Sequence, residues 1–171
     1  HSPYRPVAVY ASDVNGDGIT ELPRAVLMAG YKDTSSSDAV YMLDWYAYGI
    51  GKVPAKVATT YQNISDAWSL LIDQKWHDRI TAIKANDGGL SYVEFFEYRK
   101  NKMSIPLFNT YCATGSNREY YAERTDLIQL GQTTQAIYFA KLTNEGEQSE
   151  LALTGDEIKA RFSLVNQAWN N

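Results

Sequence analysis

Side chains with carboxylate or amide oxygens recur in one short segment near the start of the chain. Counted from Asp13, they occupy positions 1, 3, 5 and 9, and a glycine stands at position 6. Calcium is a hard cation that takes about six to eight oxygen ligands from carboxylates, amides, backbone carbonyls and water. The segment therefore predicts a calcium site. Four side chains and one backbone carbonyl are its expected ligands: Asp13, Asn15, Asp17 and Glu21, with the carbonyl of Ile19.

The residues around this loop argue against an EF-hand. An EF-hand needs a bidentate glutamate at position 12, where this chain has Arg24. The preceding residues Val7–Ala11 have a β-like pattern, and Pro23 would interrupt a following helix early. Magnesium is the rival ion, but it demands near-octahedral geometry, whereas a flexible loop with a carbonyl ligand favours calcium. A metal-free Asp/Asn/Gly turn is the remaining alternative. We expect the ion to stabilise the loop and to take no part in catalysis.

The segment resembles the strand-loop-strand calcium motif, Asp-x-(Asp/Asn)-x-Asp-Gly-x-x-(Asp/Glu), of FG-GAP and VCBS-type repeats. The resemblance covers Val7–Met28 and implies a calcium ion as cofactor. It does not imply a propeller, which needs several copies. The wider order of elements looks like that of uncharacterised exported proteins and lipoproteins of Gram-positive bacteria. The residues that carry this likeness are Asp13–Pro23, Leu43–Tyr46, Trp68, Trp76 and Leu153–Ile158. It implies an extracytoplasmic location, secreted or on the cell surface, and no known activity.

Two other groups of residues offer catalytic chemistry. His77 and Cys112, with an acid, could form a nucleophilic triad, although Cys112 lies in an apolar segment where a buried, inert thiol is the common outcome. Carboxylate pairs could hydrolyse a glycosidic bond; the candidates are Glu94 with Glu97 and Glu119 with Glu123. The first pair would point to opposite faces of a strand. A hydrolase acting on envelope polymers is therefore an alternative function, and a non-catalytic role is favoured.

Aromatic residues suggest a further alternative. The chain has 13 tyrosines and 4 tryptophans, and tyrosine suits interfaces with sugars or proteins because it combines an apolar ring with a polar tip. Tyr111, Tyr120 and Tyr121 are the set in which exposure is expected first. A carbohydrate-binding module that uses exposed Tyr and Trp is thus the third candidate function.

Alternating aromatic and β-branched runs, separated by Gly, Asn, Asp and Ser, predict a mainly antiparallel β-sheet that positions the loop. Segment 66–72 fits either a strand or a helix, segment 86–89 predicts a hairpin turn, and segment 117–124 has helical composition. The strands expected are 7–11, 25–29, 39–48, 53–61, 79–85, 90–99, 104–112, 127–130 and 136–142.

The end of the chain predicts a helix packed on this sheet. Thr154 and Glu157 have the spacing of a capping box, and an apolar stripe at helical spacing follows: Ile158, Phe162, Val165 and Trp169. The fold class expected is α+β. The order of strand, tryptophan turn and terminal helix is similar to that of PsbP-like domains, which implies a non-catalytic partner of larger assemblies.

Composition limits the partners. The 171 residues include 16 Lys and Arg against 20 Asp and Glu, a formal charge of −4. No basic segment exists to neutralise phosphates, so nucleic acid is not an expected partner. No apolar run approaches the roughly 18 residues of a membrane span. The single cysteine cannot form a disulfide within the chain.

Two regions are expected, a calcium motif at 1–30, which could be the end of a preceding domain, and an α+β domain at 31–171. The start at His1 instead of Met suggests a processed product or an excised domain. The function expected is a calcium-stabilised interaction module of an extracytoplasmic bacterial protein. Its partner would be a protein or a cell-envelope polymer.

Overall fold

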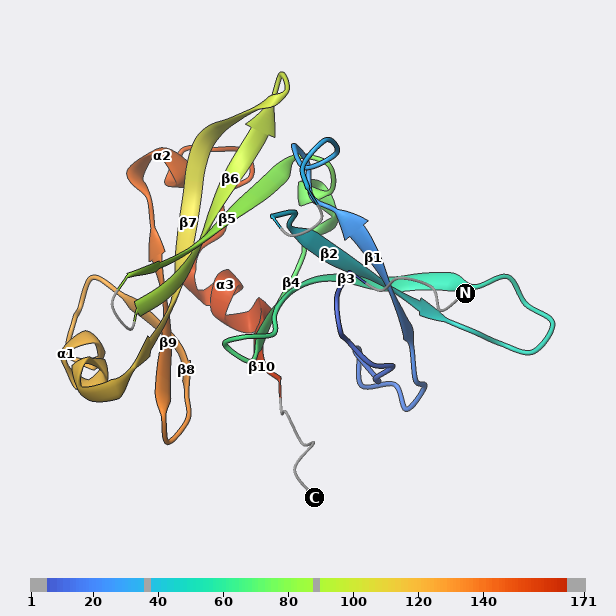
Figure 1. Ribbon diagram of the computed structural model, residues 1–171, viewed down its shortest axis with the longest axis horizontal. Coiled ribbons are helices and arrows are strands. Elements are labelled where there is room, and N and C mark those ends of the chain that lie inside the picture. The colour runs from blue at the N-terminus through green and yellow to red at the C-terminus, as the bar shows by residue number, and fades with distance from the viewer. Residues whose placement is uncertain (1–5, 36–37, 88–89, 166–171) are drawn as a thin grey trace.

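Two β-sheets make up most of the molecule. The structure is a computed structural model that describes residues 6–35, 38–87 and 90–165. Within these ranges ten strands form two five-stranded sheets in which every pairing is antiparallel (Figure 1). The mainly antiparallel β-structure expected from the sequence is therefore confirmed.

The first sheet has the strand order β1-β2-β3-β4-β10, with bounds Leu22–Leu27, Tyr41–Ala47, Ala55–Asn63, Trp68–Leu71 and Phe162–Leu164. The second has the order β5-β6-β7-β9-β8, with bounds Ile80–Asp87, Leu90–Arg99, Lys102–Thr114, Ala136–Leu142 and Ile128–Gln132. The described helices are short: η1 (Gln74–Trp76), η2 (Gly115–Asn117), α1 (Arg118–Ala122), α2 (Asn144–Glu147) and α3 (Gly155–Arg161).

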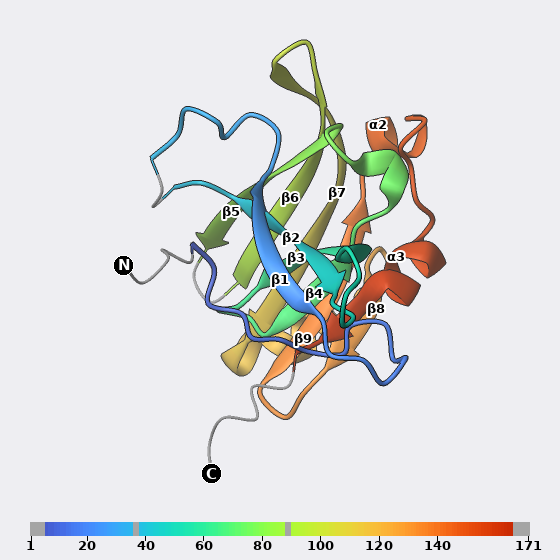
Figure 2. The same ribbon diagram turned by 90° about the vertical axis from the view of Figure 1, so that its right-hand side faces the viewer.

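The hydrophobic core lies between the two sheets, one of which lies in front of the other in Figure 2. Aromatic rings join the two layers. Tyr61 of β3 meets Phe95 of β6 edge to face with ring centroids 5.5 Å apart, and Phe95 stacks on Phe108 of β7 at 4.8 Å. Ile158 of α3 is completely buried in the same core. The sheets therefore form a rigid support for the loops at their edges.

Strand β1 is the edge of the first sheet and follows directly on the acidic loop. It pairs with β2 from Leu22 opposite Tyr46 to Leu27 opposite Tyr41. Proline has no N–H to donate, so Pro23 is tolerated in an edge strand, where one side has no neighbouring strand to bond. The boundary expected at residue 30 therefore separates two strands of a single sheet, so residues 22–27 belong structurally with the region that follows.

The strand expected at residues 7–11 is wrong. These residues belong to no strand, and Ser12 alone forms an antiparallel bridge, with Glu21. A strand needs a partner for its backbone N–H and C=O groups. Residues 8–12 instead run along a groove beside side chains of the first sheet, such as Gln62 and Ser69, where no strand edge is offered.

The end of the last predicted helix is also wrong. The capping box forms at Thr154 as expected, but α3 ends at Arg161 and Phe162 begins β10. Pairing with β4 gives this segment backbone partners, and the Phe162 ring stacks on Trp68 at 5.6 Å. Contacts distant in sequence thus override the local helical spacing. Trp169, the last member of the stripe, lies outside the described residues.

The remaining expectations on local structure agree better with the fold. Segment 66–72 contains the strand β4, and the helical segment at 117–124 contains α1. Strands β5 and β6 pair as a hairpin through Asp87 opposite Leu90, and the two turn residues between them lie outside the described ranges.

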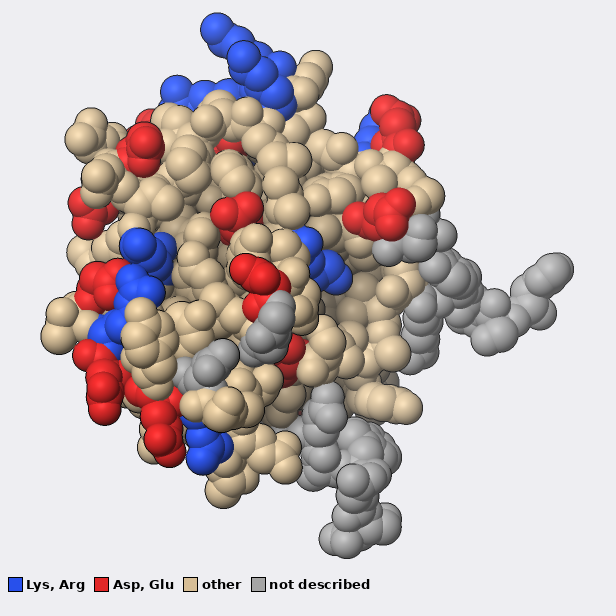
Figure 3. Space-filling model, turned by 60° about the vertical axis from the view of Figure 1, so that its left-hand side comes forward, with Lys and Arg blue, Asp and Glu red and all other residues tan. Residues whose placement is uncertain are grey.

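Charged groups are spread over the molecular surface. Figure 3 brings the side of the second sheet forward and shows acidic and basic side chains interspersed among uncharged ones. Within the described ranges no helix combines the length and the apolar character needed to cross a membrane.

Candidate metal centre

The acidic loop is closed at its base by a pair of backbone hydrogen bonds. The Ser12 amide donates to the Glu21 carbonyl at 3.1 Å, and the Glu21 amide donates to the Ser12 carbonyl at 2.9 Å. Between them, Gly16 and Gly18 adopt φ angles of 76° and 83°. Glycine is favoured at such left-handed positions because it has no Cβ. The sheet edge and two glycines therefore set the path of the loop.

Asp13 organises the first half of the loop through backbone amides. Its Oδ1 accepts the amides of Gly16 at 2.7 Å and Asp17 at 3.1 Å, and its Oδ2 accepts the amide of Gly18 at 2.8 Å. The hydrogen bond from Gly18, followed by those from the other loop amides, lowers the pKa of Asp13 although desolvation opposes it. Asp13 is therefore held as an anion, and its two oxygens retain lone pairs for a further ligand.

Asp17 lies at the centre of a second set of short-range bonds. Its amide donates to Asn15 Oδ1 at 3.0 Å, and Asn15 Nδ2 donates to Asp17 Oδ2 at 2.9 Å. The Ile19 amide donates to Asp17 Oδ1 at 2.8 Å. Such side-chain-to-backbone bonds are typical of Asx turns. They hold the three middle residues of the predicted ligand set in one compact turn.

Glu21 closes the loop from inside the protein. Its side chain is 0% exposed. Oε2 accepts the Val14 amide at 2.9 Å, whereas Oε1 is buried without a hydrogen-bond partner among the described residues. An isolated buried carboxylate is unfavourable by several kcal/mol unless a cation or a set of donors balances it. One oxygen of Glu21 is therefore left for a ligand that none of the described residues provides.

The three carboxylates of the loop converge. One oxygen from each of Asp13, Asp17 and Glu21 lies within 4.8 Å of the other two. Calcium binds oxygen at about 2.3–2.6 Å, so two ligands on opposite sides of one ion are about 5 Å apart. The oxygens are thus spaced to share a single ion, and the donor set is the hard-oxygen type that calcium prefers.

The structure thus brings three of the five predicted ligands together, with Asn15 bonded to Asp17 through its side chain and Ile19 bonded to it through its amide. The sequence did not reveal the role of the Val14 amide or the burial of Glu21. No residue type signals a backbone donor. The burial arises from the bridge to Ser12 and the start of β1, which are properties of the fold.

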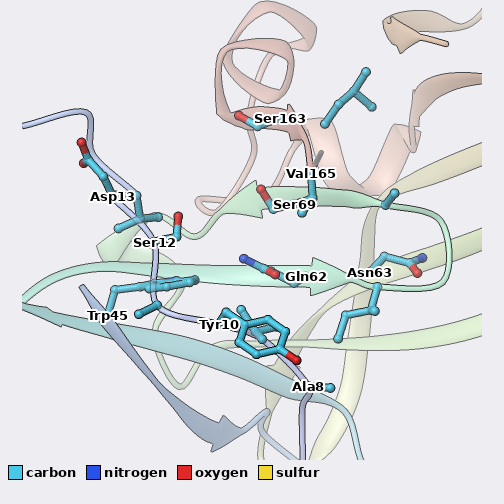
Figure 4. Close-up of a pocket in the computed structure, with 16 residues that line it drawn as sticks. Ala8, Tyr10, Ser12, Asp13, Trp45, Gln62, Asn63, Ser69, Ser163 and Val165 are labelled. Carbon is cyan, nitrogen blue, oxygen red and sulfur yellow. The ribbon is translucent and has the colours of Figure 1, made fainter. Parts of the chain in front are cut away.

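A groove of about 690 Å³ adjoins the loop (Figure 4). One wall is the segment from Ala8 to Val14, and the other is the first sheet, where Gln62, Ser69 and Ser163 lie next to one another on strands β3, β4 and β10. The polar residues Gln62 and Ser69 follow buried Tyr61 and Trp68. Buried aromatic and polar residues therefore alternate along both strands. This pattern in the sequence could have indicated a polar face of the sheet and thus the groove.

The candidate nucleophile and base do not form a site. Cys112 is buried, and burial raises its pKa to about 11, so its thiol stays protonated near neutral pH. His77 Nδ1 lies 3.3 Å from Asp78 Oδ2, and His77 is not among the residues that line the groove. Nothing in these contacts activates the thiol as catalysis would require.

The proposed acid pairs have separate surroundings. Glu97 is buried and receives a hydrogen bond from Arg99, whereas Glu94 is half-buried and lies 3.4 Å from Asn109 Nδ2. Glu119 and Glu123 are both exposed at α1 and the turn after it. None of these contacts indicates two carboxyls that face each other across a substrate.

The tyrosines near α1 are only partly exposed. Tyr120 is exposed, but Tyr111 and Tyr121 each stack on Phe139 with ring centroids 5.0 Å and 5.4 Å apart. Rings that pack face to face use those faces within the protein. The arrangement is therefore a small aromatic cluster on the second sheet.

Comparison of the chain with protein-family models, with curated proteins and with solved structures gave no match.

Proposed function

We propose that the chain is a calcium-stabilised, non-catalytic interaction module. The ion is held by carboxylates of Asp13, Asp17 and Glu21, with Asn15 Oδ1 and the Ile19 carbonyl as further oxygen ligands. The observation that carries this proposal is Glu21 Oε1, which is completely buried yet has no hydrogen-bond partner among the described residues. A divalent cation would balance this carboxylate and the two that approach it.

The bound ion links two parts of the chain. Asp13 and Asp17 belong to the loop, whereas Glu21 is hydrogen-bonded to Ser12 and directly precedes β1. An ion shared by the three therefore fixes the loop to the edge of the first sheet. Because the ion binds the folded protein, it stabilises that state by mass action. Millimolar calcium outside the cytoplasm would fill even a weak site.

The setting we propose follows the resemblance to FG-GAP and VCBS-type loops. It is an exported protein or cell-surface lipoprotein of Gram-positive bacteria, with a protein or an envelope polymer as partner. We also propose that α3 covers the sheets as in PsbP-like domains. The complete burial of Ile158 supports that role for the helix.

Saccharide binding is a second candidate, favoured by the groove beside the loop. Its lining combines the exposed ring of Tyr10 with uncharged polar side chains such as Gln62 and Ser69, whereas Trp45 beneath them is almost completely buried. Such a set suits a neutral polyhydroxylated ligand, because aromatic rings pack on C–H faces while amides and hydroxyls bind hydroxyl groups.

Isothermal titration calorimetry with calcium chloride tests the leading proposal. The wild-type chain is expected to bind one calcium ion, and Asp17→Asn and Glu21→Gln each to weaken binding at least tenfold. Glu123→Gln, which neutralises an exposed carboxylate away from the loop, is the matched control and should bind as wild type does. Absence of calcium binding by the folded wild-type chain would overturn the proposal.

A further inference from the structure

The turn between β2 and β3 carries unusually exposed apolar side chains. Ile50 is 106% exposed relative to a free residue, Val53 is 89% exposed and Tyr48 is 56% exposed. Gly51 adopts a φ of 70°, so the chain reverses tightly and the side chains stand outward. The hairpin projects beyond the body of the molecule at the right of Figure 1. Large exposed apolar groups of this kind mark interaction sites.

This apolar tip lies at the same end of the first sheet as the acidic loop. Leu22, the first residue of β1, pairs with Tyr46, the last but one residue of β2. The strands are antiparallel, so the chain before Leu22 and the chain after Ala47 leave the sheet in the same direction. The proposed calcium site and the tip therefore both lie at this end of the sheet.

Charges at this end depend on whether the loop holds an ion. Residues 12–24 and 44–58 contain four carboxylates, Asp13, Asp17, Glu21 and Asp44, against three cations, Arg24, Lys52 and Lys56. The formal sum is negative without a divalent ion and positive with one. Lys52 lies in the tip itself, between Ile50 and Val53. Calcium would thus change this end from one that repels an anionic surface to one that attracts it.

We propose that the β2–β3 tip docks on an anionic lipid bilayer when the acidic loop holds calcium. The inference rests on the proposed calcium site and names the partner of the module. Ile50 and Val53 enter the boundary between head groups and acyl chains, while Lys52 and the calcium-filled loop lie at the level of the phosphates. A bilayer suits the tip because the tip is convex and combines apolar side chains with nearby cations. The acyl chains can accept the apolar side chains, and the anionic head groups above them can accept the cations.

Co-sedimentation with lipid vesicles tests this docking. Vesicles of phosphatidylcholine with about one third phosphatidylglycerol are compared with pure phosphatidylcholine, each in calcium and in EDTA. Binding is expected with the anionic vesicles in calcium, and weaker by at least about tenfold in EDTA or on neutral vesicles. Ile50→Ser and Val53→Ser should each lower vesicle affinity about tenfold, as expected for removing one apolar side chain from the bilayer.

Both substitutions lie at exposed positions, so folding and calcium affinity should be unchanged. Met103→Ser, at an exposed apolar position on β7, is the matched control and should bind vesicles as wild type does. Calorimetry with calcium alone separates the two proposals. A chain that binds calcium but not anionic vesicles overturns the docking and leaves the site intact, whereas a chain that binds no calcium overturns the site. Equal vesicle binding by wild type and Ile50→Ser also overturns the docking.

Discussion

Glu21 and Glu97 are both completely buried, but the two glutamates differ in what surrounds them. Arg99 Nε donates to Glu97 Oε1, an Arg79 guanidinium nitrogen lies 3.9 Å from the same oxygen, and Ser149 Oγ donates to Oε2 at 3.1 Å. Glu21 receives one backbone amide and faces two further carboxylates. The same rule, that a buried charge needs compensation, applies to both sites. The chain supplies the cations at Glu97, whereas the proposed function assigns the cation at Glu21 to the solution.

The largest effect is expected from removing Arg99, the cation that the chain supplies to Glu97. Arg99→Met should lower the free energy of unfolding by about 3 kcal/mol, because it leaves the buried Glu97 carboxylate with the Ser149 hydroxyl and with Arg79 as a distant cation. Chemical denaturation in calcium and in EDTA should give the same loss. Arg99→Lys keeps the charge and should lose less. A methionine variant as stable as wild type would mean that Glu97 does not depend on its arginine, and the contrast with Glu21 would fail.

The next largest effect is expected from removing the calcium ion proposed at Glu21. With calcium at about one hundred times its dissociation constant, binding should add about 2.7 kcal/mol to the stability of the folded state. For a chain of this length, EDTA should then lower the melting temperature by roughly 5–10 °C. Thermal melts followed by circular dichroism give the measurement. Coincident melting curves in calcium and EDTA would contradict an ion at the loop.

The third prediction exchanges each glutamate for its neutral isostere. In EDTA, Glu21→Gln should gain about 1 kcal/mol of stability, because an amide relieves the repulsion from Asp13 and Asp17. In calcium it should be less stable than wild type. Glu97→Gln should lose stability in both conditions, because Arg99 and Arg79 lose the buried carboxylate and keep the exposed Glu150 as their partner. Denaturation curves in both conditions give the measurement. If Glu21→Gln has the same order of stability relative to wild type in calcium and in EDTA, Glu21 is not a ligand.

The fourth prediction concerns the loop backbone. Gly18→Ala places a Cβ in open space at a φ of 83°, so its cost is conformational, about 1 kcal/mol. Gly51→Ala meets the same open space at a φ of 70° in the β2–β3 turn and should be destabilised to a similar degree. Calorimetry should distinguish them, since only the Gly18 substitution should weaken calcium binding. If both variants bound calcium equally well, Gly18 would have no role in the calcium site.

The sequence alone could predict what depends on short-range spacing. The oxygen pattern at Asp13 and Asp17 and the capping box at Thr154 are formed by residues a few positions apart. The structure brings the two carboxylates together and forms the capping box. What depends on distant contacts could not be read in this way. The end of α3 is set by pairing with β4, and the burial of Glu21 is set by the bridge to Ser12.

Glu157 is a third kind of carboxylate, satisfied by donors at the start of α3, and it gives the smallest predicted effect. Its Oε2 accepts the Thr154 amide at 2.8 Å. This bond, with that from the Thr154 hydroxyl, lowers the pKa of Glu157 below its usual 4.5. The folded-state pKa is therefore depressed, so the stability that the charge provides is present above pH 4.5 and is lost as the pH falls through the folded pKa.

Glutamine at position 157 can still accept the Thr154 amide but carries no charge. Glu157→Gln should therefore be slightly less stable than wild type at neutral pH, and the two should converge as the pH falls below 4.5. Because this carboxylate has its donors within the chain, the difference should be the same in calcium and in EDTA. Urea denaturation at several pH values measures it. If the stability difference between wild type and Glu157→Gln changed with calcium, Glu157 would also respond to the ion. The distinction between Glu21 and carboxylates that have their donors within the chain would then be wrong.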